Sequence, residues 1–349
     1  MNAREKAYVR PVDFRDGRVD MSHGAGGRAM AQLVDELFLA ALDNPWLRKL
    51  NDQACFAPPA GRLVITTDSH VVTPLVFAGG DIGSLSVHGT INDVAMAGAR
   101  PLYLTAGFIL EEGFPLGELR RIVESMAAAS REAGVPVVAG DTKVVEKGKG
   151  DGVFITTTGV GVVPDGVEIS AERARPGDAV LVSGTLGDHG VAILSKRANL
   201  DFETPIRSDT AALHGLVAAM VEAAPAIRCL RDPTRGGLAA TLNEFAQASG
   251  AGFRIRERAL PIKPEVHAAC EFLGLDPLNV ANEGKLVAVC APDDAAKLLA
   301  AMRAHPLGRD AALIGEVVED PQRFVQMETR LGGWRIVDWL TGEQLPRIC

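Results

Sequence analysis

The chain has 349 residues, which is long enough for two domains, and its 47% hydrophobic and 23% charged residues are ordinary for a globular protein. A formal net charge of −8 argues against non-specific binding to nucleic acid or to an anionic membrane. No run reaches the roughly 18 apolar residues of a membrane span, and the start MNAREKAYVR lacks the apolar core of a secretory signal. These features predict a cytoplasmic protein without a membrane segment.

The first half of the sequence alternates helix-like and strand-like patterns. The glycine-rich stretch SHGAGGR precedes a helix predicted for residues 30–42. Apolar spacing predicts two more helices at 85–97 and 115–133, the latter bounded by Pro115 and Gly134. Strands are predicted at 63–67, 102–110, 135–139 and 153–163. This order predicts an α/β or α+β domain with a mixed sheet over residues 1–165.

The pattern breaks at PDGVEISAERARPG, residues 164–177, where we place a domain boundary. A second domain is predicted for 166–337, followed by a tail at 338–349. Its expected helices span 189–196, 208–223 and 293–304, and its expected strands span 179–182, 253–255, 286–290, 312–318 and 334–337. Glycine-rich turns lead into helices at GGDIGSLSVHG and RDPTRGGLAAT, so the halves are either related domains or simply contain helices built alike.

Aspartates stand at several turns and predicted strand ends, where α/β proteins assemble their sites. Mg²⁺ bound to phosphate takes one or two such carboxylates, with phosphate oxygens and water as further ligands. The alternative is turn formation and helix capping, for which aspartate is also well suited. The residues concerned are Asp68, Asp81, Asp93, Asp141 and Asp232.

Three further stretches carry candidate chemistry. The glycine amides of SHGAGGR could bind an anion at a helix start, although the stretch matches neither a Rossmann nor a P-loop motif and could be a flexible turn. Lys143 in GDTK could neutralise a transferring phosphoryl group, and Glu283 in NEGK is a candidate general base. Taken alone, each residue is more simply a solvated surface side chain.

Five cysteines lie far apart, without CxxC or Cys/His spacing, which disfavours a zinc, iron–sulfur or redox-dithiol site, and their odd number in a reducing compartment disfavours a disulfide framework: Cys55, Cys229, Cys270, Cys290 and Cys349. Cys349 is the last residue of the chain, in LPRIC. Its own α-carboxylate disfavours the thiolate, whereas Arg347 favours it. The last eight residues can extend about 27 Å at about 3.4 Å per residue, so a terminal thiol can move between active sites. The alternative is an ordinary solvated tail.

Seven blocks together resemble the HypE family of hydrogenase maturation factors, the carbamoyl dehydratases: SHGAGGR, TTDSHVVTP, GGDIGSLSVHGTINDVAMAGARP, VAGDTKVV, RDPTRGG, NEGK and the terminal PRIC. That family belongs to the ATP-binding superfamily of aminoimidazole ribonucleotide synthetase and selenophosphate synthetase. The resemblance covers essentially the whole chain. It implies an α/β, two-domain PurM-like fold, with an N-terminal mixed sheet that forms a dimeric barrel-like core and a C-terminal α/β sandwich.

The resemblance also implies an ATP and Mg²⁺ site between the domains. The implied catalytic residues are Cys349, Glu283 and Lys143. The implied metal ligands are Asp68, Asp93, Asp141 and Asp232. The implied nucleotide contacts are Gly24, Gly26, Gly27, Asp68, Asp81, Asn92, Asp93, Asp141 and Thr142.

The implied reaction begins when the carbamoyltransferase HypF loads Cys349 with a carbamoyl group. ATP-dependent dehydration then gives a thiocyanate, whose cyanide passes to iron on a HypC–HypD scaffold. The implied assembly is a homodimer. Two alternatives stay open: another ATP-dependent enzyme of the superfamily, or a non-enzymatic nucleotide-binding scaffold. Selenophosphate synthetase is disfavoured, because it usually has a cysteine or selenocysteine in the glycine-rich segment where this chain has His23.

Overall fold

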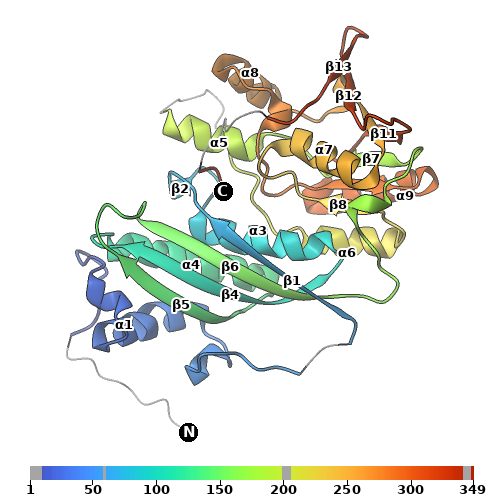
Figure 1. The fold of residues 1–349 in the computed structure, drawn as a ribbon. Helices are drawn as coiled ribbons and strands as arrows, with labels where there is room; N and C mark the ends of the chain where they lie inside the picture. The colour runs from blue at the N-terminus through green and yellow to red at the C-terminus, as the bar shows by residue number, and fades with distance from the viewer. Residues whose placement is uncertain (1–9, 58–59, 199–205, 341–346) are drawn as a thin grey trace.

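The structure is a computed structural model that describes residues 10–57, 60–198, 206–340 and 347–349. Each half of the chain builds its own sheet, and helices cover these sheets (Figure 1). Of the predicted tail at 338–349, residues 341–346 lie outside the described part of the chain. The domain boundaries after residues 165 and 337 stay predictions.

The first sheet has four strands in the order β1-β6-β4-β5. Only the β4–β5 pair is parallel, so the sheet is mixed as predicted. Helices α3 and α4 cover one of its faces (Figure 1). Pro115 is the N-cap of α4, and Gly134 ends that helix with φ 68°, which confirms both expected boundaries. The elements are β1 (Arg62–His70), β4 (Arg100–Glu111), β5 (Val137–Val145), β6 (Val153–Val163), α3 (Ile82–Met96) and α4 (Leu116–Ala133).

The two faces of this sheet differ in what covers them. In β1, alternate residues point to opposite faces, so Thr66, Asp68 and His70 face α3. The other face, called the outer face below, carries large exposed apolar side chains: Leu63 is 62% exposed, Ile65 72% and Ile109 42%. The inner face is therefore closed by helices, whereas a solvent-exposed apolar band runs over the outer face.

The second sheet has seven strands in the order β13-β12-β9-β11-β7-β10-β8. Its central strands bury both faces: the side chains of one face pack with α7, and those of the other pack with α6 and α9. The strands are β7 (Ala179–Val182), β8 (Cys229–Arg231), β9 (Gly252–Arg256), β10 (Val287–Cys290), β11 (Ala312–Val318), β12 (Val325–Glu328) and β13 (Trp334–Ile336). The helices are α5 (Asp188–Arg197), α6 (His214–Ala223), α7 (Gly237–Ser249), α8 (Pro264–Leu273) and α9 (Pro292–Ala304).

Several sequence-based boundaries were wrong. Asp68 and Asp141 lie within β1 and β5 rather than beyond them, because both strands continue through polar residues that pair in register. The helix expected at 208–223 begins only at His214, since the Ser208 side chain caps the backbone N–H of Thr210 in an extended turn.

The helix expected at 30–42 consists of three contiguous helical pieces: α1 (Arg28–Leu33), the π-helical η2 (Val34–Leu39) and α2 (Ala40–Leu42). The patterns did not predict β8, β12 or α8. Within the described residues, none of the helices combines the length and apolarity required to cross a membrane.

Candidate active site

Three acidic side chains gather where the inner face of the first sheet meets the second domain. Asp68 comes from β1, Asp93 from α3, and Asp232 from the loop after β8. Thr66 Oγ1 donates to Asp93 Oδ2 over 3.1 Å. Burial raises the pKa of Asp93 to about 6 and that of Asp232 to about 7, and repulsion among the three carboxylates adds to both shifts. The cluster therefore concentrates carboxylates whose negative charge Arg231 and Arg235 offset only in part.

Glu283 lies beside this cluster, in the loop that leads into β10, and is only 2% exposed. Burial raises its pKa well above the usual range, and the nearby Asp232, Asp209 and Asp68 raise it further. Its Oε1 atom is buried and accepts no hydrogen bond from the described residues. A buried carboxyl group with a free oxygen and a raised pKa is suited to proton transfer near neutral pH.

The end of the chain lies in the same site. Val71 N donates to Cys349 O over 3.0 Å, and Thr73 N donates to Arg347 O over 3.2 Å. The Cys349 thiol lies beside the carboxyl group of Glu283, and each group shifts the pKa of the other. Burial raises the pKa of this thiol well above its usual range, and the negative charge of Glu283 raises it further. The docked terminus therefore brings a protonated thiol to a candidate base.

The acidic cluster fits a hydrated divalent cation. Mg²⁺ binds proteins through a few carboxylates and takes phosphate oxygens and water for the rest of its shell. Across the described residues, no three His, Cys, Asp or Glu side chains converge in ready-made ligand geometry. A cation at Asp68, Asp93 and Asp232 therefore depends on ligands from outside the protein, as a nucleotide-bound Mg²⁺ does.

A second group of predicted residues lies on β5. Lys143 Nζ contacts the two carboxylate oxygens of Asp141 at 2.6 and 2.7 Å, and this ion pair lowers the pKa of Asp141. Thr142 N donates to Asp141 Oδ1 over 2.8 Å, whereas the Thr142 side chain is buried on the inner face. Gly24 packs against β5 so closely that an added Cβ would lie 2.6 Å from Val144 N. The glycine-rich segment thus lies next to the Asp141–Lys143 pair.

The two groups lie on opposite faces of the sheet. Opposed residues in neighbouring strands share a face, and the pairings place Asp141 in a row with Ser69, one residue after Asp68. Two strands separate β1 from β5, which corresponds to about 14 Å. Within one chain, the structure gathers Asp68, Asp93 and Asp232 with Glu283 and Cys349. It does not bring Asp141 or Lys143 to them.

Asp81 and Asn92 have structural partners. Asp81 is the N-cap of α3, where its Oδ1 accepts Ser84 N over 2.9 Å. Asn92 is fully buried: its Oδ1 accepts Leu213 N, and its Nδ2 donates to the backbone oxygens of Ala211 and Glu283. Asn92 therefore joins α3 to the Glu283 loop. Gly26 and Gly27 border open space before α1. Nucleotide contacts by these four residues stay predictions.

Sequence reasoning missed several residues around the site. Arg235 is exposed, and its charge influences the pKa values of Asp93 and Cys349. It stands in the RDPTRGG block, so the motif itself held the signal. His70 lies 3.3 Å from Asp68 Oδ2 and is 1% exposed, and Asp209 Oδ1 accepts Glu283 N over 3.1 Å. His70 stands in the TTDSHVVTP block, whereas Asp209 has no local signal, since only the fold brings it to the acids.

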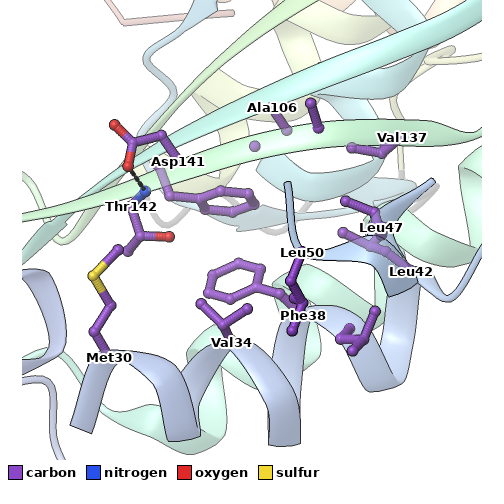
Figure 2. A pocket seen from close by; sticks show the side chains of 14 residues that line it. Met30, Val34, Phe38, Leu42, Leu47, Leu50, Ala106, Val137, Asp141 and Thr142 are labelled. Atoms are coloured by element: carbon purple, nitrogen blue, oxygen red, sulfur yellow. Dashed lines mark hydrogen bonds between the residues drawn. The ribbon is translucent and has the colours of Figure 1, made fainter. Parts of the chain in front are cut away.

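A separate cavity lies between the helical segment α1–η2–α2 and the strands β4 and β5 (Figure 2). Its walls are apolar apart from Asp141 and Thr142, and the side chains of Met30, Val34 and Phe38 point into it (Figure 2). None of the three clustered acids lines it. Its chemistry suits hydrocarbon rather than phosphate, so the candidate active site is the acidic cluster with Glu283 and Cys349.

Comparison with known proteins identifies relatives over nearly the whole chain. A family model described as AIR synthase related protein, N-terminal domain, matches residues 50–163, and the corresponding C-terminal domain model matches residues 175–328. Carbamoyl dehydratase HypE of Cupriavidus necator is 71% identical over 343 residues, 98% of each chain. The protein of the same name from Escherichia coli is 48% identical over 336 residues, 95% of this chain and 99% of the other.

Solved structures agree with these matches. A crystal structure of hydrogenase maturation protein HypE in complex with ATP superposes with a TM-score of 0.91 at 50% identity, covering 94% of this chain and 99% of that one. A HypE–HypF complex matches with a TM-score of 0.78 at 51% identity, covering 88% and 99%. The predicted two-domain PurM-like α/β fold is thereby confirmed.

Proposed function

This chain belongs to the HypE family of carbamoyl dehydratases, and from that premise we propose that it uses ATP to dehydrate an S-carbamoyl group on Cys349 to a thiocyanate during hydrogenase maturation. The family is one of enzymes, and so is this chain. The observation that carries the proposal is the docked chain end, which brings the Cys349 sulfur to the buried carboxyl group of Glu283 beside a cluster of acids. The cyanide of that thiocyanate is the product to be delivered to the hydrogenase iron.

ATP is the phosphoryl donor in this proposal, supported by the solved relative that contains ATP. Asp68, Asp93 and Asp232 would hold Mg²⁺, which when bound neutralises charge on the phosphates. The uncompensated repulsion among these acids supports such a role. Arg235, at the edge of the cluster, supplies a cation that phosphate can pair with. The amides of Gly24, Gly26 and Gly27 would cover the phosphates from the glycine-rich segment.

The first chemical step joins the carbamoyl oxygen to the γ-phosphorus while the bond to ADP breaks. One N–H proton passes from the nitrogen to water, so the group becomes an O-phosphorylated imidate on sulfur. In the second step, the Glu283 carboxylate takes the remaining N–H proton, the C=N bond becomes C≡N, and the C–O bond breaks to release phosphate. The oxygen of the eliminated water thus leaves in the phosphate. Burial makes Glu283 a stronger base than an exposed glutamate.

The raised pKa of the docked thiol indicates that carbamoyl loading and dehydration take place at different sites. A protonated thiol is a poor nucleophile, so Cys349 is unsuited to attack while it is docked. A carbamoylated sulfur needs no thiolate, and both the thiocarbamate and the thiocyanate are uncharged. The docked site thus favours the dehydration over the loading of the cysteine. We assign the loading to HypF, with the tail undocked, and the HypE–HypF complex of a relative supports that partnership.

A homodimer would explain why the outer face of the first sheet carries exposed apolar side chains. The exposed Leu63, Ile65 and Ile109 form an apolar band that joining the sheets of two copies would bury. Lys143 and Asp141 project from the same face, away from Cys349 of their own chain. We propose that Lys143 reaches the active site of the second copy, where it stabilises charge on the oxyanion or the phosphoryl group. Asp141 and Thr142 would join the nucleotide site there, with Asp141 as a further Mg²⁺ ligand.

The remaining assignments follow from this chemistry. The thiocyanate would transfer its cyanide to iron on a HypC–HypD complex, because a terminal thiol can enter a partner's site. The enzyme would act in the cytoplasm, without nucleic acid or membrane. Asp81 and Asn92 would shape the nucleotide site through their contacts with α3 and the Glu283 loop.

The decisive experiment replaces the reactive atom. Cys349→Ser, incubated with the carbamoylating partner and Mg·ATP, is expected to lose all product while it keeps ATP binding, measured by calorimetry. In the unchanged protein, intact-mass spectrometry is expected to detect a carbamoyl adduct on the C-terminal peptide and an ATP-dependent loss of one water from it. Retained hydrogenase maturation by Cys349→Ser would instead support a non-enzymatic scaffold and would exclude the proposed reaction.

A further inference from the structure

The docked chain end forms an isolated antiparallel β-bridge, Val72 with Ile348, beside the residues that follow β1. The backbone oxygens of Arg347 and Cys349 both point toward this segment and accept from Thr73 N and Val71 N. The oxygen of Ile348, between them, points the opposite way, as alternation along a strand requires. The side chain of Ile348 is 2% exposed and packs in the core of the first domain. Each of the three terminal residues is thus held through its main chain.

His189 receives the outward-facing oxygen. It lies in the first turn of α5, is fully buried, and its Nε2 stands 2.7 Å from Ile348 O. A carbonyl oxygen accepts hydrogen bonds, so Nε2 carries the proton and Nδ1 accepts from Ser208 Oγ over 2.8 Å. The ring of Phe77 packs edge-on against the imidazole. Ser208 and Phe77 therefore fix both the tautomer and the orientation that the tail needs.

Arg197 completes the arrangement from the last turn of the same helix. Its guanidinium group donates to the backbone oxygens of Thr73 and Arg347, joining the two strands at the open end. The Arg347 side chain pairs with Asp151. Arg347 adopts φ 53°, a conformation that costs energy for a residue with a side chain. The docked tail is thus held in an unfavourable local conformation by specific contacts.

We propose that His189 and Arg197 form a main-chain receptor for the last three residues, which sets their register so that residue 349 alone meets Glu283. A slip by one residue would turn every side chain to the other face. Ile348 would then face the acids, and Cys349 would enter the apolar core. Because the receptor binds main-chain oxygens, it leaves the Cys349 sulfur free to carry an attached group.

The same segment that orients His189 also holds the candidate base. Ser208 binds the imidazole of His189, and its neighbour Asp209 accepts the backbone N–H of Glu283 over 3.1 Å. An added Cβ at Gly284 would lie 1.8 Å from Asp209 O, so the two loops have no room to shift. His189 on α5 and the Glu283 loop before β10 are therefore tied to the same segment, Ser208–Asp209, which keeps the receptor and the base in a fixed relation. The catalytic consequence rests on the proposed function, but the receptor itself does not.

Thiol accessibility tests the receptor without ATP or any partner. The full-length protein carries Cys55→Ser, because Cys55 is exposed while Cys229, Cys270 and Cys290 are buried. Alkylation of Cys349 by iodoacetamide is followed by intact-mass spectrometry. His189→Ala and Arg197→Ala are each expected to speed labelling by about threefold to tenfold, the range that the loss of one hydrogen bond corresponds to. Lys196→Ala, the loss of an exposed cation in the same turn of α5, is the matched control and is expected to label at the unchanged rate.

The outcomes separate the receptor from general unfolding. Unfolded protein would add alkyl groups at the three buried cysteines as well, whereas an undocked tail adds one. Unchanged labelling in both His189→Ala and Arg197→Ala would overturn the receptor, and so would equal acceleration in Lys196→Ala. Arg197 is only half-buried, at the end of α5, so its variant keeps the test valid if His189→Ala does not fold.

A second readout addresses register. Once the protein is carbamoylated, both receptor variants are expected to slow dehydration while the affinity for ATP stays unchanged. His189→Gln, which can donate to Ile348 O, is expected to recover part of the rate. If Cys349→Ser kept function while His189→Ala sped labelling, the proposed reaction would fail and the receptor would stand. If the labelling rates did not change but the reaction proceeded, the receptor alone would fail.

Discussion

The two faces of the first sheet shift the pKa values of their carboxylates in opposite directions. On the inner face, burial and mutual repulsion raise the pKa of Asp93 to about 6, and no lysine or arginine neutralises the cluster within hydrogen-bonding distance in the described residues. On the outer face, Asp141 is exposed beside Lys143, and its pKa is lowered. The inner face thus presents carboxylates whose repulsion a bound cation would relieve. On the outer face, Lys143 neutralises Asp141, but the pair lies away from Cys349 of the same chain. In the proposed dimer, this pair would join the acidic cluster of the second copy.

The largest effect is expected from Glu283, the buried candidate base beside the acids of the inner face. Glu283→Gln removes the proton acceptor but keeps the shape, so the rate of thiocyanate formation is expected to fall by about 10²- to 10⁴-fold. ATP affinity, measured by calorimetry, is expected to stay the same. Glu271→Gln, on the exposed side of α8, is the control. A Glu283→Gln enzyme with near-normal turnover would remove Glu283 from the mechanism.

Mixing two inactive variants tests whether the faces cooperate across a dimer. Lys143→Ala and Glu283→Gln are each expected to be inactive as homodimers. If Lys143 serves the opposite copy, a mixed dimer has one intact site and one doubly altered site. Random exchange at equal amounts then gives about a quarter of full activity, because half of the dimers are mixed and each has one good site of two. Single-turnover assays of the re-equilibrated mixture measure this value.

The opposite result has a clear meaning. If Lys143 acted within its own chain, every chain in the mixture would still lack one group, and activity would stay at the background of the two variants. Such a result would also require β5 to move by about 14 Å relative to β1, which the continuous pairing of the four strands opposes. The experiment therefore tests the placement of the site and not only the importance of Lys143.

Much of the fold followed from local patterns. The strand at 153–163 and the helix ended by Gly134 had clear apolar periodicity and end signals, and both were confirmed. The motifs also identified the acids of the inner face, because aspartates in strands and turns stand out against an apolar background. Asp68 and Asp141 were nevertheless placed beyond strands that in fact contain them. Polar residues in the middle of a strand look like its end when the sequence alone is read.

The division of the site was not predictable from sequence. Asp68 and Asp141 occur in similar motifs, yet the register of four strands turns them to opposite faces, and register is a property of the sheet rather than of either segment. The same holds for His189, which reaches Ile348 across 159 positions of sequence. Such residues carry no local signal, because long-range packing alone gives them their partners.

The smallest expected effect concerns stability, and its sign differs between the faces. In the unfolded chain Asp93 ionises near 3.8, but in the folded protein its pKa is about 6. Between these values the folded state keeps a proton that the unfolded state has lost, so stability falls as pH rises through this window. The penalty is fully present above about pH 6 and absent below about pH 4. Asp93→Asn removes it and is expected to stabilise the Mg²⁺-free, nucleotide-free protein at pH 8 by about 1–3 kcal/mol, with little effect at pH 4.

Asp141→Asn is the matched variant on the outer face. The lowered pKa of Asp141 means that its ion pair with Lys143 stabilises the folded state above its unfolded pKa, and this contribution disappears as pH falls below it. Since the pair is exposed, Asp141→Asn is expected to destabilise the protein at pH 8 by about 1 kcal/mol or less. Urea unfolding in EDTA measures both variants at pH 8 and pH 4. With Mg·ATP in place of EDTA, the unaltered protein is expected to be more stable than Asp93→Asn, because only the unaltered cluster gains a cation. A variant pair that shifted in the same direction at pH 8 would mean that the acids of the two faces are not held in opposite electrostatic states.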